Sequence, residues 1–216
     1  MDLGMAIDFS TQEASFALGD INSEKIICSH SKIFSGREAS SLLSWITSEI
    51  NNTEFSIKDI KYWTYGIGPG SFTGLRIAAS IIAGLTFHKN NLFVRGISSV
   101  LPMFDLMPKE IVNKAILFDG RRNEIFYFKN SEQKMPLIIS KEVSDTFFDT
   151  YECVYAFAMH KDGITKFFGE ELAKKIVFID TFPIHKLLFN KISKYEEISD
   201  TKRFYKQKLI YLRPPV

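Results

Sequence analysis

The residues best placed to do chemistry form one continuous stretch, Gly68-Pro69-Gly70-Ser71-Phe72-Thr73-Gly74-Leu75-Arg76. An apolar run over residues 62–67 precedes it and predicts a buried strand, and residues 75–87 follow with the apolar spacing of a helix. Three glycines and a proline in this stretch predict a tight strand-to-helix turn, with Ser71 or Thr73 capping the helix. The free backbone N–H groups at such a helix start suit an anion.

The turn does not match the catalytic loops that it superficially resembles. A phosphate-binding P-loop ends in Gly-Lys-Ser/Thr, whereas the last glycine here precedes Leu75 and Arg76. A dinucleotide-binding turn spaces its glycines more closely. The nucleophile elbow of a hydrolase needs glycine two residues on either side of Ser71, where Pro69 and Thr73 stand. We therefore identify no catalytic residue.

Two carboxylates are the remaining candidates for chemistry. Asp8 and Asp119 stand at equivalent points of two similar segments, residues 6–11 and 117–122, each a strand followed by a polar turn and a second strand. They could form a nucleotide cleft by holding a metal–nucleotide complex. The alternative, which the frequency of Asx turns favours, is that each caps its own hairpin. The four histidines lie far apart and form no helical metal-binding pair, so we predict no metal site.

The same two segments predict how the chain is organised. Their similarity indicates two related halves, residues 1–107 and 108–216. Strands are expected at residues 3–8, 13–18, 25–30, 62–67, 92–97, 116–119, 124–129, 153–157 and 176–179. Helices are expected at residues 38–50, 75–87, 98–107, 169–175 and 182–191.

Composition favours a soluble, cytoplasmic protein. The 216 residues are 45% hydrophobic and 24% charged, and the 20 phenylalanines predict a phenylalanine-rich core. A net charge of +2 makes no general case for DNA or other nucleic acid, and no apolar run reaches membrane-spanning length. Cys28 and Cys153 lack metal-ligand spacing and fit buried thiols in a reducing cytosol.

The helix expected at residues 75–87 is almost free of charge, which indicates cover on both sides. One face, expected to pack on the sheet, holds the large residues Leu75, Ile77, Ala78, Ile81, Ile82 and Leu85. The opposite face would let another helix approach closely; it holds Ala79, Ser80 and Ala83, flanked by Arg76 and Phe87. We interpret this face as a partner-binding surface. The alternative is an internal helix covered by the protein's own second layer.

The helix expected at residues 38–50 adds further partner-binding candidates. Leu42 and Ile46 lie on its apolar stripe, whereas Trp45 lies off that stripe and is interpreted as an outward binding anchor. The alternative for Trp45 is partial burial beneath a neighbouring loop. At the other end of the chain, residues 202–215 mix cations with aromatics, which fits either an RNA contact or a solvated basic end.

These motifs together resemble the TsaB/YeaZ family of glycoprotease-like proteins, and the nine-residue turn resembles the family's signature. The other segments that carry the resemblance are Ala6-Ile7-Asp8-Phe9-Ser10-Thr11, Ile97-Ser98-Ser99-Val100, Phe118-Asp119-Gly120-Arg121-Arg122-Asn123-Glu124-Ile125-Phe126 and Tyr211-Leu212-Arg213. The chain departs from the family pattern at Ser44, where a proline usually follows two leucines, and at Phe9 and Gly120.

The resemblance implies an α/β fold of the actin/Hsp70/sugar-kinase (ASKHA) class, with two RNase H-like halves of mixed sheets flanked by helices. It also implies a noncatalytic scaffold that pairs with TsaD, the subunit that transfers a threonylcarbamoyl group. The acceptor is the adenosine beside the anticodon of tRNAs reading codons that begin with A. An ATPase, TsaE, binds the pair, so ATP and a metal ion would serve the complex through the partners, with no cofactor bound by this chain.

The resemblance further implies how this chain would assemble. It would contact tRNA through the complex and form a homodimer when TsaD is absent, through the helices at residues 38–50 and 75–87. The alternative function is an ASKHA-type nucleotide-dependent enzyme that uses Asp8 and Asp119.

Overall fold

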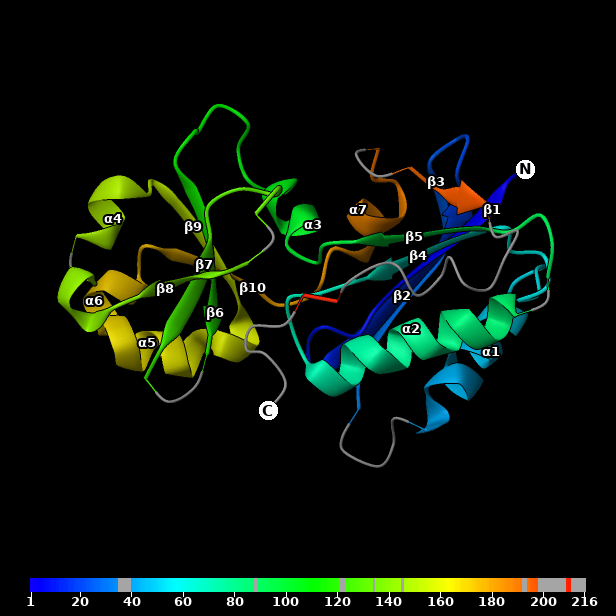
Figure 1. Cartoon of the computed structure of the whole chain (residues 1–216), viewed down its shortest axis with the longest axis horizontal. Helices are drawn as coiled ribbons and strands as arrows, with labels where there is room; N and C mark the ends of the chain where they lie inside the picture. The colour runs from blue at the N-terminus through cyan, green and yellow to red at the C-terminus, as the bar shows by residue number, and fades with distance from the viewer. Residues whose placement is uncertain are drawn as a thin grey trace. The chain divides into compact units, whose positions relative to one another are not determined.

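The computed structural model describes residues 1–34, 40–87, 89–120, 123–133, 135–144, 146–191, 194–197 and 209–210. The chain forms two compact units (Figure 1): Met1–Ser99 with Pro183–Leu209, and Val100–Phe182 with Ile210–Val216. The expected division at residues 107 and 108 differs from this one, because the chain returns to the first unit after Phe182. The segments 121–122, 202–208 and 211–215, on which part of the family resemblance and the expected RNA contact rest, lie outside the described residues.

The first unit is built on a mixed six-stranded sheet with the order β11-β5-β4-β1-β2-β3. The strands are β1 (Leu3–Asp8), β2 (Glu13–Asp20), β3 (Lys25–Ile33), β4 (Tyr62–Gly66), β5 (Phe93–Ile97) and β11 (Glu196–Glu197). The first three strands are antiparallel neighbours, whereas β1, β4 and β5 run parallel to one another. Parallel neighbours need crossover connections, and the one from β4 to β5 contains the glycine-rich turn and its helix.

Helices cover both faces of this sheet, which is why every residue of β1 is buried. One face packs on α1 (Leu42–Asn51) and α2 (Phe72–Thr86), and Met5 and Ile7 of β1 belong to that core. The other face carries α7 (Ile184–Leu188), since a Cβ at Gly4 would lie 3.4 Å from Leu188. The helix expected at residues 182–191 is therefore shorter and belongs to the first unit.

A buried arginine attaches the C-terminal segment to this face of the sheet. Arg95 of β5 is 3% exposed and donates hydrogen bonds to the carbonyl oxygens of Leu188 and Asn190, both at 2.6 Å, and to Thr64 Oγ1 at 3.0 Å. Its guanidinium also lies 3.9 Å from the ring centroid of Tyr195. Burial lowers the pKa of Arg95, and the helix-end carbonyls and the aromatic ring compensate its charge.

The second unit repeats the plan of the first on a five-stranded sheet with the order β10-β9-β6-β7-β8. Its strands are β6 (Lys114–Asp119), β7 (Ile125–Phe128), β8 (Leu137–Ile139), β9 (Cys153–Phe157) and β10 (Ile176–Ile179). Its helices are α3 (Leu101–Phe104), α4 (Phe147–Thr150), α5 (Lys161–Phe168) and α6 (Glu170–Ala173), with 3-10 turns at Lys141–Val143 and Ala158–His160. Three antiparallel strands are again followed by two parallel ones, with a helical crossover between them.

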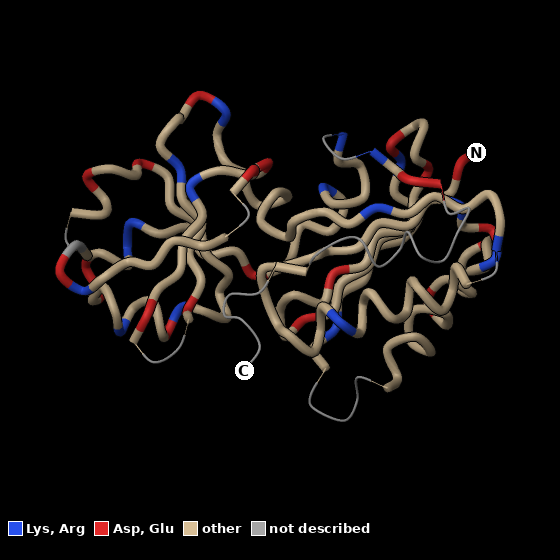
Figure 2. Tube along the Cα trace, viewed as in Figure 1, with Lys and Arg blue, Asp and Glu red and all other residues tan. Residues whose placement is uncertain are grey.

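The predicted fold class is therefore confirmed: two mixed sheets, each flanked by helices, share one order of five strands, and β11 is an additional edge strand of the first sheet. Figure 2 shows charged residues over both units, whereas α2 carries a single charge, Arg76. In the part of the chain that the structure describes, no helix is long and apolar enough to cross a bilayer.

Candidate functional site

Close backbone packing fixes the glycine-rich turn on the end of β1. The N–H of Ser71 donates to the carbonyl of Ser10 at 2.7 Å, and the Ser71 hydroxyl accepts from the N–H of Gly74 at 3.2 Å. Ser71 is thus the N-cap of α2, one of the two residues predicted for that position. A Cβ at Gly70 would lie 2.2 Å from the Ser10 carbonyl oxygen, and one at Gly74 only 1.9 Å from that of Phe9. Only glycine fits at these two positions.

Asp8 lies beneath the turn and is 1% exposed. One of its carboxylate oxygens accepts hydrogen bonds from the backbone N–H of Ser10, at 2.8 Å, and from the Ser10 hydroxyl. The other accepts from the Ser99 hydroxyl at 2.6 Å, and that hydroxyl accepts from the N–H of Gly68 at 3.2 Å. Burial raises the pKa of Asp8.

Asp8 therefore forms an Asx turn and ties the end of β1 to the glycine-rich turn. Its burial and hydrogen bonds fit the hairpin-capping alternative that the sequence favoured, and the nucleotide role stays a prediction.

Asp119, the other residue of the expected cleft, is half-buried at the end of β6. It lies against the first turn of α5, since a Cβ at Gly163 would be 2.1 Å from its carboxylate. The positive end of the helix dipole stabilises a carboxylate at this position. Within the described ranges, no group of three or more histidine, cysteine, aspartate or glutamate residues could hold a metal ion.

The apolar residues of α2 are not all buried to the extent that was predicted. Leu75, Ala78 and Ile82 face the sheet and are buried. Ile77, Ile81 and Leu85, also expected on the sheet, are only partly buried and form one side of a surface groove. The prediction is right in part for these three residues, which pack against the core on one side and line the groove on the other.

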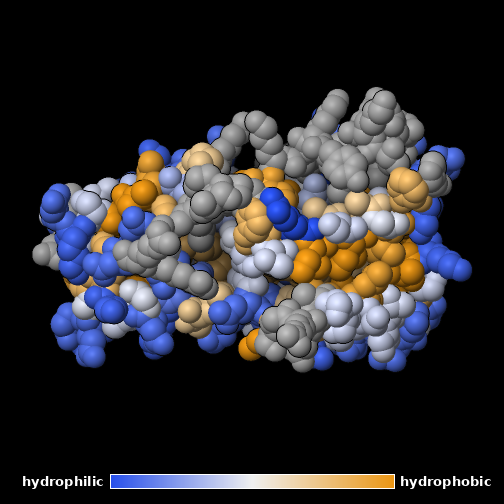
Figure 3. Space-filling view, turned by 60° about the horizontal axis from the view of Figure 1, so that its bottom comes forward, coloured by the Kyte–Doolittle hydropathy of each residue, from blue (hydrophilic) through white to orange (hydrophobic). Residues whose placement is uncertain are grey.

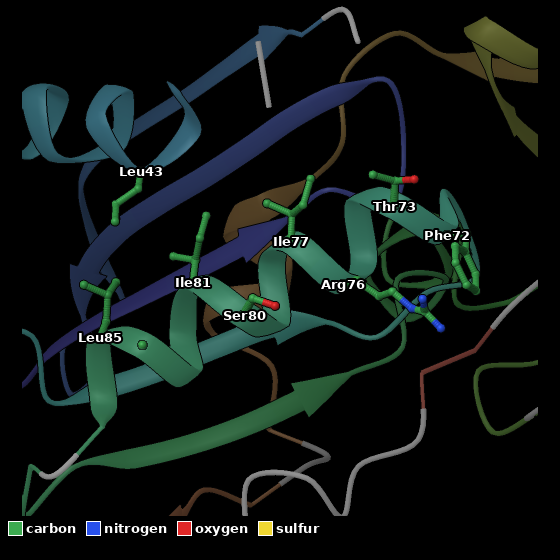
Figure 4. Close-up of a pocket in the computed structure, with 9 residues that line it drawn as sticks. Leu43, Phe72, Thr73, Arg76, Ile77, Ser80, Ile81 and Leu85 are labelled. Carbon is green, nitrogen blue, oxygen red and sulfur yellow. The ribbon is translucent and has the colours of Figure 1, made fainter. Parts of the chain in front are cut away.

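The groove has a volume of about 730 Å³ and is open to solvent (Figure 4). One lining residue comes from α1 and eight come from along α2: Leu43, Phe72, Thr73, Arg76, Ile77, Ser80, Ile81, Gly84 and Leu85. Arg76 is the single charge among them, and its guanidinium lies 3.7 Å from the ring centroid of Phe72. Figure 3 shows an extended apolar surface, coloured orange, in the right half of the view, on the first unit.

The predicted partner-binding residues of α2 and its C-terminal end differ in their exposure to solvent. Arg76 and Ser80 are exposed in the groove, and Phe87, just beyond the end of α2, is 58% exposed. Ala79 and Ala83 are half-buried on the flank of α2 outside the groove.

Three residues of α1 require correction. Leu42 and Ile46 are 3% and 1% exposed in the unit's own core, so they do not form a surface contact. Trp45 is half-buried and makes edge contacts with the rings of Phe16 and Phe34, at 5.1 and 5.3 Å between centroids. The alternative of partial burial is therefore right for Trp45. It packs at the margin of the core rather than pointing outward.

Sequence reasoning missed Leu43 and Gly84 as groove residues. Leu43, which was not among the partner-binding candidates, is 38% exposed and points toward Ile81 and Leu85 (Figure 4). Gly84 lies on the exposed side of α2, where an added Cβ would meet no atom within 4 Å. The available signal was the glycine itself, since an exposed helical glycine costs about 1 kcal/mol relative to alanine.

Comparison with known proteins assigns the family. The family model described as TsaD, tRNA N6-adenosine threonylcarbamoyltransferase, matches residues 32–187, which is more than two thirds of the chain. The chain belongs to this family, in its TsaB/YeaZ branch. The recognition from sequence is thereby confirmed.

Curated relatives in the TsaB/YeaZ branch match over part of their length. The tRNA threonylcarbamoyladenosine biosynthesis protein TsaB of Haemophilus influenzae is 30% identical over 135 residues, 61% of this chain and 55% of the relative. TsaB of Escherichia coli K12 is 31% identical over 102 residues, 46% of this chain and 41% of the relative. The matched region thus spans about half the length of these relatives.

Solved structures of the TsaB/YeaZ branch share the fold. YeaZ from Pseudomonas aeruginosa aligns with a TM-score of 0.50 and 24% identity over 65% of each chain. A second structure, an uncharacterised protein with similarity to peptidase YeaZ from Pseudomonas aeruginosa, aligns with a TM-score of 0.57 and 19% identity. It covers 77% of this chain and 80% of that one.

Proposed function

We propose that this chain is a noncatalytic scaffold subunit for threonylcarbamoyl transfer to tRNA. In this role it pairs with TsaD through the α1–α2 groove, and TsaE joins the pair in the cytoplasm. The acceptor is the adenosine beside the anticodon of tRNAs reading codons that begin with A, and tRNA is contacted through the complex. Family membership and the name shared by the matched relatives, tRNA threonylcarbamoyladenosine biosynthesis protein TsaB, support this assignment.

The observation that carries the proposal is the exposed apolar groove on α2. Contiguous apolar surface on a soluble protein marks an interaction site. The fold itself does not demand it, because the crossover helix α5 occupies the equivalent place in the second unit and exposes Lys161, Asp162 and Lys166. The difference between two helices with the same topological position therefore supports a binding role for α2.

The alternative function, a nucleotide-dependent enzyme, would need an accessible carboxylate at the end of β1. The hydrogen bonds from Ser10 and Ser99 to Asp8 argue against it. We propose accordingly that ATP and a metal ion enter the complex through TsaD and TsaE, and that this chain binds no cofactor. In the absence of TsaD, a second copy would occupy the groove and form a homodimer.

Size-exclusion chromatography with light scattering tests the proposal, using the chain alone and mixed with TsaD from the same organism. We expect a one-to-one complex that displaces any homodimer. Gly84→Leu, which fills the groove, should abolish the complex. Ser48→Leu is the matched control, because it adds the same side chain at an exposed position of α1 outside the groove. Failure to form a complex even with TsaE, ATP and tRNA present would refute the assignment.

A further inference from the structure

The groove has two chemically different ends. Leu43, Ile81 and Leu85 make one end wholly apolar, whereas Arg76 stands beside Phe72 at the other (Figure 4). The distance along α2 between the two ends is about 20 Å, at 1.5 Å per residue. This length fits between three and four turns of a docked helix, at about 5.4 Å per turn, and such a helix would bring aliphatic side chains to the apolar end. The groove therefore distinguishes the two directions in which a helix can dock.

Arg76 is exposed and makes no ion pair among the described residues. Its guanidinium is nevertheless held in one place by the face of the Phe72 ring at 3.7 Å. A docked helix would remove water from this guanidinium, and a desolvated cation is costly unless a carboxylate or equivalent acceptor compensates it. An occupant that buries this guanidinium must therefore supply an acceptor at this end.

A second copy of this groove does not supply a carboxylate. A two-fold interface brings the same patch from both subunits together, and the nine lining residues contribute two arginines and no acidic group. If the two α2 helices cross at Ser80, each Arg76 faces the neighbourhood of the other copy's Gly84, which has no side chain. Within the nine lining residues, a self-complementary contact therefore offers neither cation an anionic partner.

We propose that Arg76 selects a heterologous partner over a second copy, by pairing with a carboxylate on a helix of that partner that docks in the groove. This inference rests on the proposed function, in which the partner is TsaD. Arg76 is then a specificity residue, whereas the apolar end of the groove supplies contact area to either occupant. Phe72 positions the guanidinium for this pairing.

The test compares two affinities in the same set of variants. Isothermal titration with TsaD gives the heterodimer, and sedimentation equilibrium of the chain alone gives the homodimer. We expect Arg76→Gln to weaken TsaD binding about tenfold and Arg76→Glu about a hundredfold, with the homodimer unchanged or tighter. Raising the salt concentration should weaken the wild-type heterodimer more than the Arg76→Gln complex.

Lys25→Glu is the matched control, since it makes the same change in charge at an exposed position of the edge strand β3. It should alter TsaD affinity less than threefold, and circular dichroism verifies that each variant is folded. If Arg76→Glu weakens both complexes equally, or leaves TsaD affinity unchanged while Gly84→Leu abolishes it, the selection role is overturned and the scaffold function stands. If the wild-type chain binds no TsaD, both proposals are overturned.

Discussion

The buried Arg95 offers the sharpest test of how the C-terminal segment is held. Replacing it by Met keeps the length of the side chain but removes the donors to the carbonyls of Leu188 and Asn190. Each buried carbonyl left without that donor costs about 1–3 kcal/mol, and the lost contact with Tyr195 adds about 2 kcal/mol. Removing a desolvated cation recovers part of this loss, so we expect a net destabilisation of about 3 kcal/mol.

This loss should appear first as local opening of α7, because Arg95 contacts the end of that helix rather than the rest of the core. Hydrogen exchange with mass spectrometry measures it directly, and 3 kcal/mol corresponds to roughly hundredfold faster exchange of the α7 amides. Arg95→Lys keeps the charge but lacks the planar fork that reaches both carbonyls, so we expect an intermediate effect.

Arg76→Met is the control for the loss of an arginine at an exposed site, and it should change the free energy of unfolding by less than about 0.5 kcal/mol. The reasoning is refuted if Arg95→Met leaves α7 exchange within threefold of wild type. It is also refuted if exchange increases equally in β6 and β9 of the second unit, since the contacts of Arg95 described here lie in the first.

Two further predictions concern the glycine-rich turn and its helix. Gly74→Ala should destabilise the protein by about 1–3 kcal/mol, because the added Cβ would clash with the Phe9 carbonyl oxygen. Gly84→Ala in the same helix should stabilise it by about 0.5–1 kcal/mol, because the added Cβ meets no atom there. Urea unfolding of both variants measures these changes, and effects of equal sign would contradict the prediction. Because burial raises the pKa of Asp8 above 3.8, folding favours its protonated form, so its contribution to stability is greatest below that value and declines as pH rises through the folded pKa. The difference in unfolding free energy between wild type and Asp8→Asn should therefore shift in favour of the variant from about pH 4 to pH 7, and a constant difference would contradict this prediction.

The sequence predicted the elements that follow from local rules. They include the strand before the glycine-rich turn, the cap at Ser71 and the repeated strand–aspartate–turn segments. These could be predicted because turn chemistry and apolar periodicity act over a few residues. The sequence did not predict that α7 returns to the first unit. It depends on Arg95 meeting carbonyls more than 90 residues away in the chain, and no short-range pattern reports such a contact.

The groove shows the same limit at the scale of one helix. A helical wheel separates an apolar arc from a polar one, but it does not say where a neighbouring helix stops covering that arc. Ile77, Ile81 and Leu85 have the residue types of core positions, and they are only partly buried because they also line the groove. A helical wheel therefore predicts that these side chains contact the core, but it does not predict the part of each that stays exposed.

That mismatch is itself informative about function. The part of an apolar side chain that stays exposed on a helix flank adds no stability to the free subunit, and a helical glycine with open space around it is a further cost. Both costs fall on α2 and on the same side of it, at Ile81 and Gly84, whereas the equivalent helix α5 exposes charged residues. These stability costs lie on one surface of α2 and are absent from α5. Binding of a partner in the groove would recover them, so we expect this chain to act through the α1–α2 groove rather than through Asp8.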